Sequence, residues 1–357
     1  MIRPFERILI RSTSWIGDSV ISIPALRELR RIFPSSEMVL LVKPWVRDVF
    51  LDADFIDDML IHKNGFSGTL STIQAIRKAH FDAAILFQNA FIAAALVYCA
   101  GIPVRIGFPT DHRRLLLTHP LDLAEPVRQS HQIFYYLDIA SKVEELAFRR
   151  SGVDFQTPDF RLPVSEVRKA RARTYLHGLG LDVSQKLIAV NPGATNSRAK
   201  QWPADRFAQI GEWLADSCDC NVLLMGAPSE KELSESIAHR MQHPPVLLTG
   251  QTTLAESIAI LSICDLVISN DTGPAYLSAA LGRPTLTIFG PTNSNMICPT
   301  SDTAHIVRSP VHCAPCMFRD CPTGHECMRG VTVDMVYRRA MDLLSDGRTR
   351  ANPECKA

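Results

Sequence analysis

The sequence predicts an α/β protein built from two doubly wound, Rossmann-like units. Short apolar strands alternate with helical segments along most of the chain, which indicates mainly parallel sheets. The strands are almost continuously apolar, as in a sheet covered on both faces. At 357 residues the chain is also longer than one ordinary domain. We expect one unit over residues 1–160 and a second over 161–345, joined by a polar stretch at 151–163 that contains two prolines.

The first unit begins with the apolar strand 7–11 (RILIR). Gly17 then leads into a helix over 18–32, which ends before Pro34 because proline cannot continue a helix. The second unit begins with a helix over 164–178 and has the same alternation. Apolar runs bounded by turn residues predict further strands at 38–42, 59–62, 83–87, 104–108, 187–191, 221–225, 246–248, 266–269 and 285–289, and periodic segments predict helices at 204–216, 229–242, 253–263 and 274–281.

Composition excludes several classes of protein. Lys and Arg number 38 against 37 Asp and Glu, so the chain lacks the basic excess of a protein that binds duplex nucleic acid. Hydrophobic residues make up 46% and charged residues 21%, which excludes a disordered chain. Charges at positions 3, 6, 7 and 11 leave no room for a signal peptide. We therefore expect a cytoplasmic protein that binds no nucleic acid.

A loop that follows the first strand, residues 11–18 (RSTSWIGD), carries the first candidate catalytic group. Ligands of open α/β sheets bind beyond the carboxyl ends of the strands, which is where this loop lies. Gly17 allows a tight turn, and Asp18 follows it in the first turn of a helix. Asp18 can act as a general base there, or it can simply complement the helix dipole.

Two further loops suit a phosphate group. Residues 191–203 (NPGATNSRAKQWP) place small residues beside Arg198 and Lys200 after a strand, although solvated loop charges explain them equally well. Residues 269–276 (SNDTGPAY) place Thr272 and Gly273 at a helix N-terminus, which is an anion site or an ordinary cap. Any one of these loops is a weak signal of a ligand site, but three anion- or acid-bearing loops on two Rossmann-like units are not.

Four segments resemble glycosyltransferase family 9, the ADP-heptose:lipopolysaccharide heptosyltransferases. They are RSTSWIGDSVISIPAL, NPGATNSRAKQWP, MGAPSEKE and SNDTGPAYLSAALGRPTLTIFGPT, and their order and spacing also match. The SxSWIGD and AKxWP patterns are most similar to the heptosyltransferase II branch. The resemblance implies a GT-B fold with two Rossmann-like domains facing a central cleft, the N-terminal domain for the acceptor and the C-terminal domain for the nucleotide sugar.

The implied reaction is inverting transfer of L-glycero-D-manno-heptose from ADP-heptose to the heptose–Kdo–lipid A inner core of lipopolysaccharide. By the resemblance, Asp18 is the general base and Lys200 meets the donor diphosphate. Glu230 would bind the nucleotide ribose, and Thr272 with Gly273 the phosphate. Asp271 would hold the same loop. The resemblance implies no cofactor for the transfer itself.

One departure concerns the donor. Family members often have His where this chain has Tyr276, and a phenol can donate a hydrogen bond to a phosphate but does not become cationic near neutral pH. Two alternatives therefore stay open. The chain could use another nucleotide sugar, or it could bind a nucleotide or metal without catalysis.

The acceptor implied by the family is anionic and amphipathic. Arg105, Arg113 and Arg114 could form a basic rim for its phosphate and carboxylate groups, or lie on a solvated loop. A peripheral contact with the cytoplasmic face of the inner membrane would suit such a lipid, but we expect Trp45 and Phe91 to pack in the core.

Four of the ten cysteines fall close together in the Cys-rich segment, residues 312–328. Four thiolates can hold a structural zinc ion or an iron–sulfur cluster, or else they remain thiols or form disulfides. The compact spacing C-x2-C-x4-C-x5-C differs from the usual pair of separated CxxC knuckles. The candidate ligands are Cys313, Cys316, Cys321 and Cys327.

Overall fold

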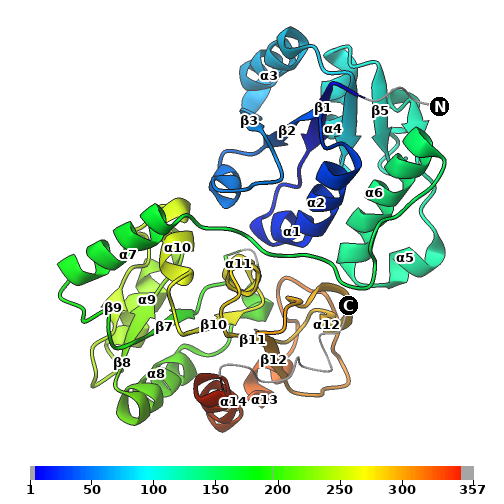
Figure 1. Cartoon of the computed structure of the whole chain (residues 1–357). Helices are drawn as coiled ribbons and strands as arrows, with labels where there is room; N and C mark the ends of the chain where they lie inside the picture. Colours follow the sequence, from blue (N-terminus) through cyan, green and yellow to red (C-terminus); the bar gives the residue numbers. More distant parts are fainter. Residues whose placement is uncertain (1–4, 196, 347–357) are drawn as a thin grey trace. The chain divides into compact units, whose positions relative to one another are not determined.

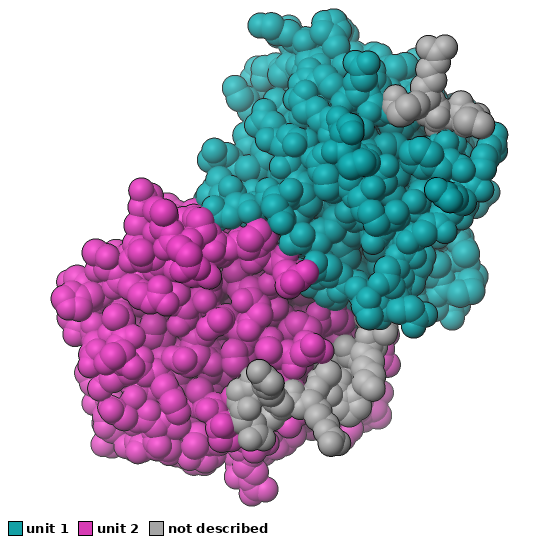
Figure 2. Space-filling model, in the orientation of Figure 1, with its two compact units in different colours: residues 1–160 teal, residues 161–357 magenta. Residues whose placement is uncertain are grey.

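The computed structural model describes residues 5–195 and 197–346 and divides into two compact units, residues 1–160 and 161–357 (Figure 2). The acceptor and donor roles expected of the two units remain predictions. Each unit contains one six-stranded sheet in which all strand pairs are parallel (Figure 1). The predicted α/β class with two doubly wound units is therefore confirmed.

Unit 1 has the strand order β3-β2-β1-β4-β5-β6. Helix α2 packs against α6, while α3 packs against α4, so the sheet core is covered by two helical layers. The strands are β1 (Arg7–Arg11), β2 (Glu37–Val42), β3 (Asp58–Ile61), β4 (Ala83–Leu86), β5 (Val104–Gly107) and β6 (His119–Pro120). The helices are α1 (Ile16–Ile21), α2 (Ile23–Ile32), α3 (Gly65–Ala79), α4 (Phe91–Cys99), α5 (Glu125–Gln129) and α6 (Gln132–Phe148).

The predicted helix over 18–32 is interrupted. It forms α1 and α2, with Ser22 serving as the C-cap of the first and the N-cap of the second. Pro24 in the first turn of α2 lacks the N–H that a continuous helix would need. The interruption makes α1 a short element of six residues, and Asp18 lies in its first turn.

Unit 2 has the strand order β12-β11-β10-β7-β8-β9. Helices α7, α10 and α11 pack together on one side of its sheet, and α8, α9 and α14 on the other (Figure 1). The strands are β7 (Lys186–Asn191), β8 (Cys220–Leu224), β9 (Val246–Leu247), β10 (Leu266–Asn270), β11 (Thr285–Phe289) and β12 (Ala304–Arg308). The helices are α7 (Glu166–Gly178), α8 (Ala204–Cys218), α9 (Lys231–Ala238), α10 (Leu254–Leu261), α11 (Gly273–Ala280), α12 (Ser294–Ile297), α13 (Glu326–Gly330) and α14 (Val333–Asp346).

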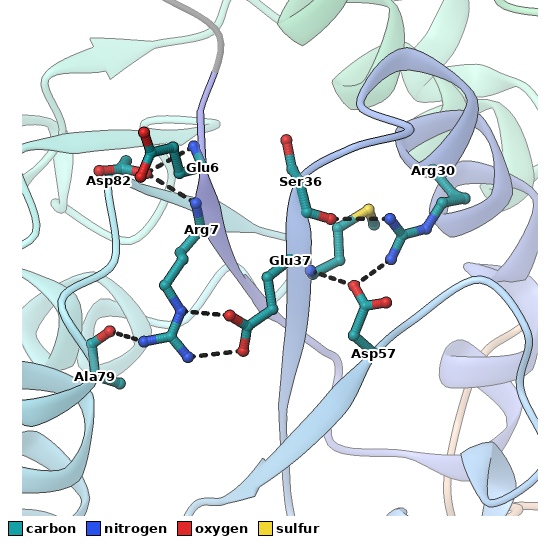
Figure 3. Close-up of polar contacts among 9 residues, drawn as sticks. Glu6, Arg7, Arg30, Ser36, Glu37, Asp57, Ala79 and Asp82 are labelled. Carbon is teal, nitrogen blue, oxygen red and sulfur yellow. Dashed lines mark hydrogen bonds and ion pairs between the residues drawn. The ribbon is translucent and has the colours of Figure 1, made fainter.

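At the amino ends of the strands in unit 1, acidic and basic side chains form ion pairs and hydrogen bonds (Figure 3). Arg7 binds Glu37 through two hydrogen bonds of 2.7 Å, from Nε and from a terminal nitrogen. Asp82 accepts from the backbone N–H of Arg7 at 2.8 Å, and Asp57 pairs with Arg30. Acids and bases at this edge satisfy one another, so it offers little charge to a ligand.

In each sheet the strand order changes direction at one strand, which we call the reversal point. Strand β1 lies between β2 and β4 in unit 1, and β7 lies between β8 and β10 in unit 2. Connections leave such neighbouring strands in opposite directions, which opens a crevice beyond their carboxyl ends. The loops after these strands are therefore the expected places for ligand groups.

No helix in residues 5–195 and 197–346 is long and apolar enough to cross a membrane.

Candidate active site

A lysine–aspartate pair lies at the reversal point of unit 2. Lys200, in a short 3-10 helix after β7, places its Nζ 2.7 Å from Asp271 Oδ2 and 3.2 Å from the Asp271 carbonyl oxygen. The Asp271 side chain is 1% exposed and that of Lys200 23%. A carboxylate this deeply buried requires charge-assisted partners, so the pair fixes the two loops against each other. An ammonium carries three protons, and one of them can still serve a ligand.

Two hydroxyl groups complete the surroundings of Asp271. Tyr276 OH lies 2.8 Å from Asp271 Oδ1, and Thr292 Oγ1 donates to Asp271 Oδ2 at 2.7 Å. Tyr276 OH is also 2.6 Å from the carbonyl oxygen of Ile297. Tyr276 is buried at 7% exposure. The sequence suggested that this phenol would face the donor phosphate, whereas the structure gives its hydroxyl two partners within the protein.

Asn270 braces the same loops, and sequence reasoning missed it. Its Nδ2 donates to the carbonyl oxygen of Pro192 at 2.8 Å, and its Oδ1 accepts from the backbone N–H of Trp202 at 3.2 Å. The residue is completely buried at the end of β10. An asparagine that ends an otherwise apolar strand was the available signal, because a buried amide must bond several backbone groups.

Helix α11 begins beside this pair. Thr272 is its N-cap residue, and its side chain makes no capping hydrogen bond to the helix. Gly273 is the first helical residue and Pro274 follows in the first turn. Pro274 has no N–H and the N–H of Ala275 donates to the Thr272 carbonyl oxygen at 3.0 Å, so the backbone N–H of Gly273 and the helix dipole favour an anion at this end, next to the Lys200 ammonium.

Glu230 lies on the other side of the β7 loop, after β8. Its Oε1 accepts from Thr195 Oγ1 at 2.8 Å, and its Oε2 accepts from the backbone N–H of Ala227 at 2.9 Å. A Cβ atom added to Gly193 would overlap the Glu230 carboxylate. The absence of a side chain at Gly193 therefore lets the acid reach over the loop, and Glu230 stays partly exposed.

In unit 1, Asp18 lies close to the corresponding reversal point. Its loop is joined to the end of β4 by the hydrogen bond from Gln88 Nε2 to Ser14 Oγ, at 3.1 Å. Asp18 is partly exposed. Burial raises the pKa of Tyr136 well above its usual value, and the charge of Asp18 raises it further. This coupling places the Asp18 carboxylate near the phenol of α6.

Arg11 and Lys43 form a cationic group at the carboxyl ends of β1 and β2, and His62 lies beside them at the end of β3. Arg11 is completely buried, and it donates to the carbonyl oxygen of Leu41 at 2.8 Å and contacts His62 Nδ1 at 3.3 Å. Burial lowers the pKa of Arg11 to about 10. Burial, then Arg11 and Lys43, lower the pKa of His62 to about 4.

Among the described residues, no carboxylate contributes to the pKa shifts of these three groups. The cationic group thus contrasts with the paired charges at the amino ends of the strands. Positive charge of this kind attracts anions. Sequence reasoning did not find the cationic group, because these three residues are 19 or more positions apart and meet only through the strand order.

A search for related proteins decides the family. The model of glycosyltransferase family 9 (heptosyltransferase) matches residues 69–326. The chain belongs to glycosyltransferase family 9. The matched residues thus include Lys200, Glu230 and Asp271 of unit 2, whereas Asp18 lies before them.

Two curated heptosyltransferases align over most of this family 9 chain. Lipooligosaccharide heptosyltransferase 2 of Campylobacter jejuni is 26% identical over 348 residues, covering 95% of this chain and 99% of that protein. Lipopolysaccharide heptosyltransferase 2 of Escherichia coli is 24% identical over 314 residues, covering 85% and 88%.

The fold of family 9 is equally clear from solved structures. The ADP-heptose lipopolysaccharide heptosyltransferase II of E. coli superposes with a TM-score of 0.81 at 22% identity, covering 95% of this chain and 98% of that one. The E. coli heptosyltransferase WaaC with ADP-2-deoxy-2-fluoro heptose gives a TM-score of 0.69 at 21% identity, covering 94% and 99%. This family 9 chain therefore has the GT-B type of fold.

The arginines proposed for a basic rim occupy different environments in this family 9 chain. Arg113 is completely buried, and it donates to the carbonyl oxygens of Phe108 (2.8 Å) and Gln88. Arg105 donates to the carbonyl oxygen of Leu116 at 2.6 Å. Both side chains are therefore bound by the protein itself, and the expectation that they form an exposed rim is not met. Arg114 is exposed.

The proposed metal ligands of the Cys-rich segment are unpaired thiols. Cys313 is exposed, Cys316 and Cys321 are partly exposed, and Cys327 is buried. In the described part of this family 9 chain, the one group of three or more ligand atoms within 4.8 Å of one another is Glu212, Asp216 and His243. The four sulfur atoms are thus more widely spaced than the ligands of a closed metal site.

Proposed function

We propose that this chain is an inverting heptosyltransferase that transfers L-glycero-D-manno-heptose from ADP-heptose to the heptose–Kdo–lipid A inner core. The observation that carries the proposal is the Lys200–Asp271 pair beside the N-terminus of α11, at the reversal point of a family 9 chain. The name of the superposed E. coli structure, an ADP-heptose lipopolysaccharide heptosyltransferase II, supports the donor, and the names of the aligned heptosyltransferases support a lipopolysaccharide or lipooligosaccharide acceptor.

The donor-side groups suit a nucleoside diphosphate. The remaining Lys200 proton and the backbone N–H of Gly273 can hold the diphosphate oxygens, and they stabilise the charge that develops as ADP leaves. Because Asp271, Tyr276 and Thr292 hold Lys200 and its loop, this stabilisation needs little rearrangement during the reaction. Glu230 offers acceptor oxygens for the ribose hydroxyls.

The acceptor side supplies the base. A sugar hydroxyl is a weak nucleophile, so Asp18 removes its proton as the oxygen attacks the anomeric carbon. Attack from the face opposite to the departing ADP inverts that carbon in one step, and no enzyme nucleophile is required. The transfer thus needs groups from both units and, in this proposal, no metal ion.

The cationic group supports an anionic acceptor. Phosphate or carboxylate groups of the inner core would neutralise the excess positive charge of Arg11 and Lys43, and exposed Arg114 could add to it. Trp45 and Phe91 are 47% and 48% exposed, so the expectation that both pack in the core is wrong. We propose that they lie toward the lipid part of the acceptor, at the cytoplasmic face of the inner membrane.

Tyr276 no longer favours a different donor. It departs from the histidine that is frequent in the family, but its hydroxyl supports Asp271 and Ile297 rather than an open site. Lys200, Thr272 and Gly273, which the resemblance assigns to the donor phosphates, remain available to a diphosphate, so ADP-heptose stays the donor that we propose.

An assay of ADP release with ADP-heptose and heptose–Kdo–lipid A tests the proposal. We expect release that depends on the acceptor in the wild type. In Asp18→Asn we expect transfer to be lost while ADP binding stays within about twofold, because the base is separate from the donor groups. Asp122→Asn, an exposed acid of the same unit, is the control.

Three outcomes would contradict the proposal. Turnover with another nucleotide sugar alone would replace the donor, and tight ADP binding without turnover of any donor would replace the enzyme by a binding protein. Transfer by Asp18→Asn at the wild-type rate would remove Asp18 from the role of base.

A further inference from the structure

An asparagine lies shortly after the carboxyl end of β4, which pairs with β1 at the reversal point of unit 1. Asn89 belongs to the loop that leads from β4 to α4, and it is partly exposed. Its backbone carbonyl oxygen accepts from Thr110 Oγ1 at 3.3 Å. Loops at this edge of an open α/β sheet carry ligand groups, and neither the general base nor the cationic group accounts for this residue.

Two donors fix the orientation of the Asn89 side chain. A terminal nitrogen of Arg113 lies 3.1 Å from Asn89 Oδ1, and Tyr135 OH donates to the same oxygen at 2.8 Å. A guanidinium only donates hydrogen bonds, so the amide atom that faces Arg113 has to be the oxygen and not the nitrogen. The amide nitrogen Nδ2 therefore lies on the side away from these two partners.

Arg113 is itself held in one position. It is completely buried, its Nε donates to the carbonyl oxygen of Phe108 at 2.8 Å, and a terminal nitrogen donates to the carbonyl oxygen of Gln88. A Cβ atom added to Gly107 would lie 3.3 Å from the guanidinium, so the glycine leaves room for it. Burial lowers the pKa of Arg113 to about 10 and raises that of Tyr135 to about 12. Both donors are therefore protonated at neutral pH.

The amide nitrogen of Asn89 is available to a ligand. Among the residues that the structure describes, Nδ2 has no hydrogen-bond partner. The fully buried side-chain atoms without a partner in the same residues include Gln88 Oε1 but not Asn89 Nδ2, so this nitrogen reaches solvent. An amide nitrogen carries two protons, and here its orientation is already fixed from the protein side. Such a group can bind an oxygen atom of a ligand without rearrangement.

The loop of Asn89 contacts the loop that carries the candidate base. The residue before it, Gln88, donates from Nε2 to Ser14 Oγ at 3.1 Å. Thr13 Oγ1 lies 2.7 Å from the Oγ atom of Ser19, which follows the base in α1. Because Thr13 and Ser14 are consecutive, the amide and the base are each one residue away from a side chain that bonds the same turn.

We propose that Asn89 Nδ2 donates a hydrogen bond to a hydroxyl oxygen of the acceptor sugar, and that this contact decides which neighbouring hydroxyl group meets Asp18. The role rests on the proposed function and adds a residue that selects the attacking oxygen. A fixed donor beside the base holds that oxygen in a reactive geometry. Arg113 and Tyr135 act through Asn89 and are positioning residues.

Asn89→Asp separates this role from a structural one. Aspartate has nearly the same shape and keeps an oxygen for Arg113 and Tyr135, but it replaces the donor by an acceptor. We expect the KM for heptose–Kdo–lipid A to rise about tenfold or more, while ADP affinity stays within about twofold and the unfolding temperature does not fall. Gln74→Glu makes the same change of amide to carboxylate on an exposed position of α3 and should alter none of these quantities.

Asn89→Ala removes both amide atoms. It should raise the KM for the acceptor to a similar extent, and it should also lower the unfolding temperature because Arg113 and Tyr135 lose their acceptor. A purely structural role predicts that only Asn89→Ala is impaired. An unchanged acceptor KM in Asn89→Asp would therefore overturn the inference.

The outcome for Asn89 is distinguishable from that for the proposed function. A wild type that does not transfer heptose contradicts the proposed function, whereas a wild type that transfers it while Asn89→Asp keeps the acceptor KM overturns only the role of Asn89. Titration of the acceptor in the presence of ADP makes the same comparison without turnover, and we expect Asn89→Asp to bind the acceptor about tenfold more weakly. Equal acceptor affinities of wild type and variant would overturn the inference in this measurement as well.

Discussion

Replacing Tyr276 with phenylalanine removes a single oxygen atom from the surroundings of Asp271. That hydroxyl lies 2.8 Å from a carboxylate that is almost fully buried. A hydrogen bond to a charged group contributes about 1.5–3 kcal/mol, and Lys200 and Thr292 remain to stabilise the carboxylate, so we expect a loss of about 2 kcal/mol. In a unit of this size such a loss lowers the unfolding temperature by about 4–8 °C.

Calorimetric unfolding and ADP titration together measure the effect of Tyr276→Phe. We expect the unfolding temperature of the variant to fall by this amount, while its ADP affinity decreases by no more than about threefold. The phenol contacts Asp271 and, in this reasoning, does not contact the nucleotide. Tyr175→Phe, an exposed tyrosine of α7, should change neither quantity. A large loss of ADP affinity at an unchanged unfolding temperature would refute the reasoning and place the hydroxyl on the donor.

Two further substitutions test other parts of the molecule. Gly193→Ala should displace the Glu230 carboxylate and weaken ADP binding, measured by titration, about tenfold or more. In the control Gly178→Ala, the added Cβ meets nothing within 4 Å, so ADP affinity should not change. Equal ADP affinities of the two variants would show that the contact between residue 193 and Glu230 does not matter for binding. The pKa of His62 is about 4 in the folded protein and 6.5 in the unfolded chain. The neutral imidazole therefore contributes its full share to the free energy of unfolding above pH 6.5, and up to about 3 kcal/mol of it is lost as the pH falls toward 4. His62→Gln should flatten this part of a denaturation series against pH, with the similar pKa of His305 leaving a smaller slope; an unaltered slope would contradict it.

Most strands could be predicted from the sequence because they are apolar runs with clear turn residues at their ends, whereas the two-residue strand β6 (His119–Pro120) has no such run and was missed. The strand at 285–289 has its predicted bounds, and 7–11 likewise. The break at Ser22 was missed because the residues on both sides favour a helix and only Pro24 interrupts it. Strand β12 was missed because it follows the last motif, in a region judged only by its cysteines.

The contacts of the site depend on which strands are neighbours, and sequence patterns do not reveal this. Lys200 and Asp271 are 71 positions apart and meet because β7 and β10 pair. Arg113 was placed at the surface because most arginines are exposed, but it is buried at the ends of β4 and β5, where it bonds their backbone oxygens. Residue types thus indicated the chemistry, and strand order decided the partners.

The hydrogen bonds of Asn270 separate the proposed donor site into residues that tolerate substitution and residues that do not. Its bonds lock the loop after β7 to the end of β10, so a replacement there disturbs several buried contacts at once. Glu230, by contrast, stands on a short turn whose residues 227–229 are exposed. We therefore expect nucleotide preference to vary among relatives, and to be engineered most easily, at that turn. The Lys200–Asp271 pair should stay unchanged.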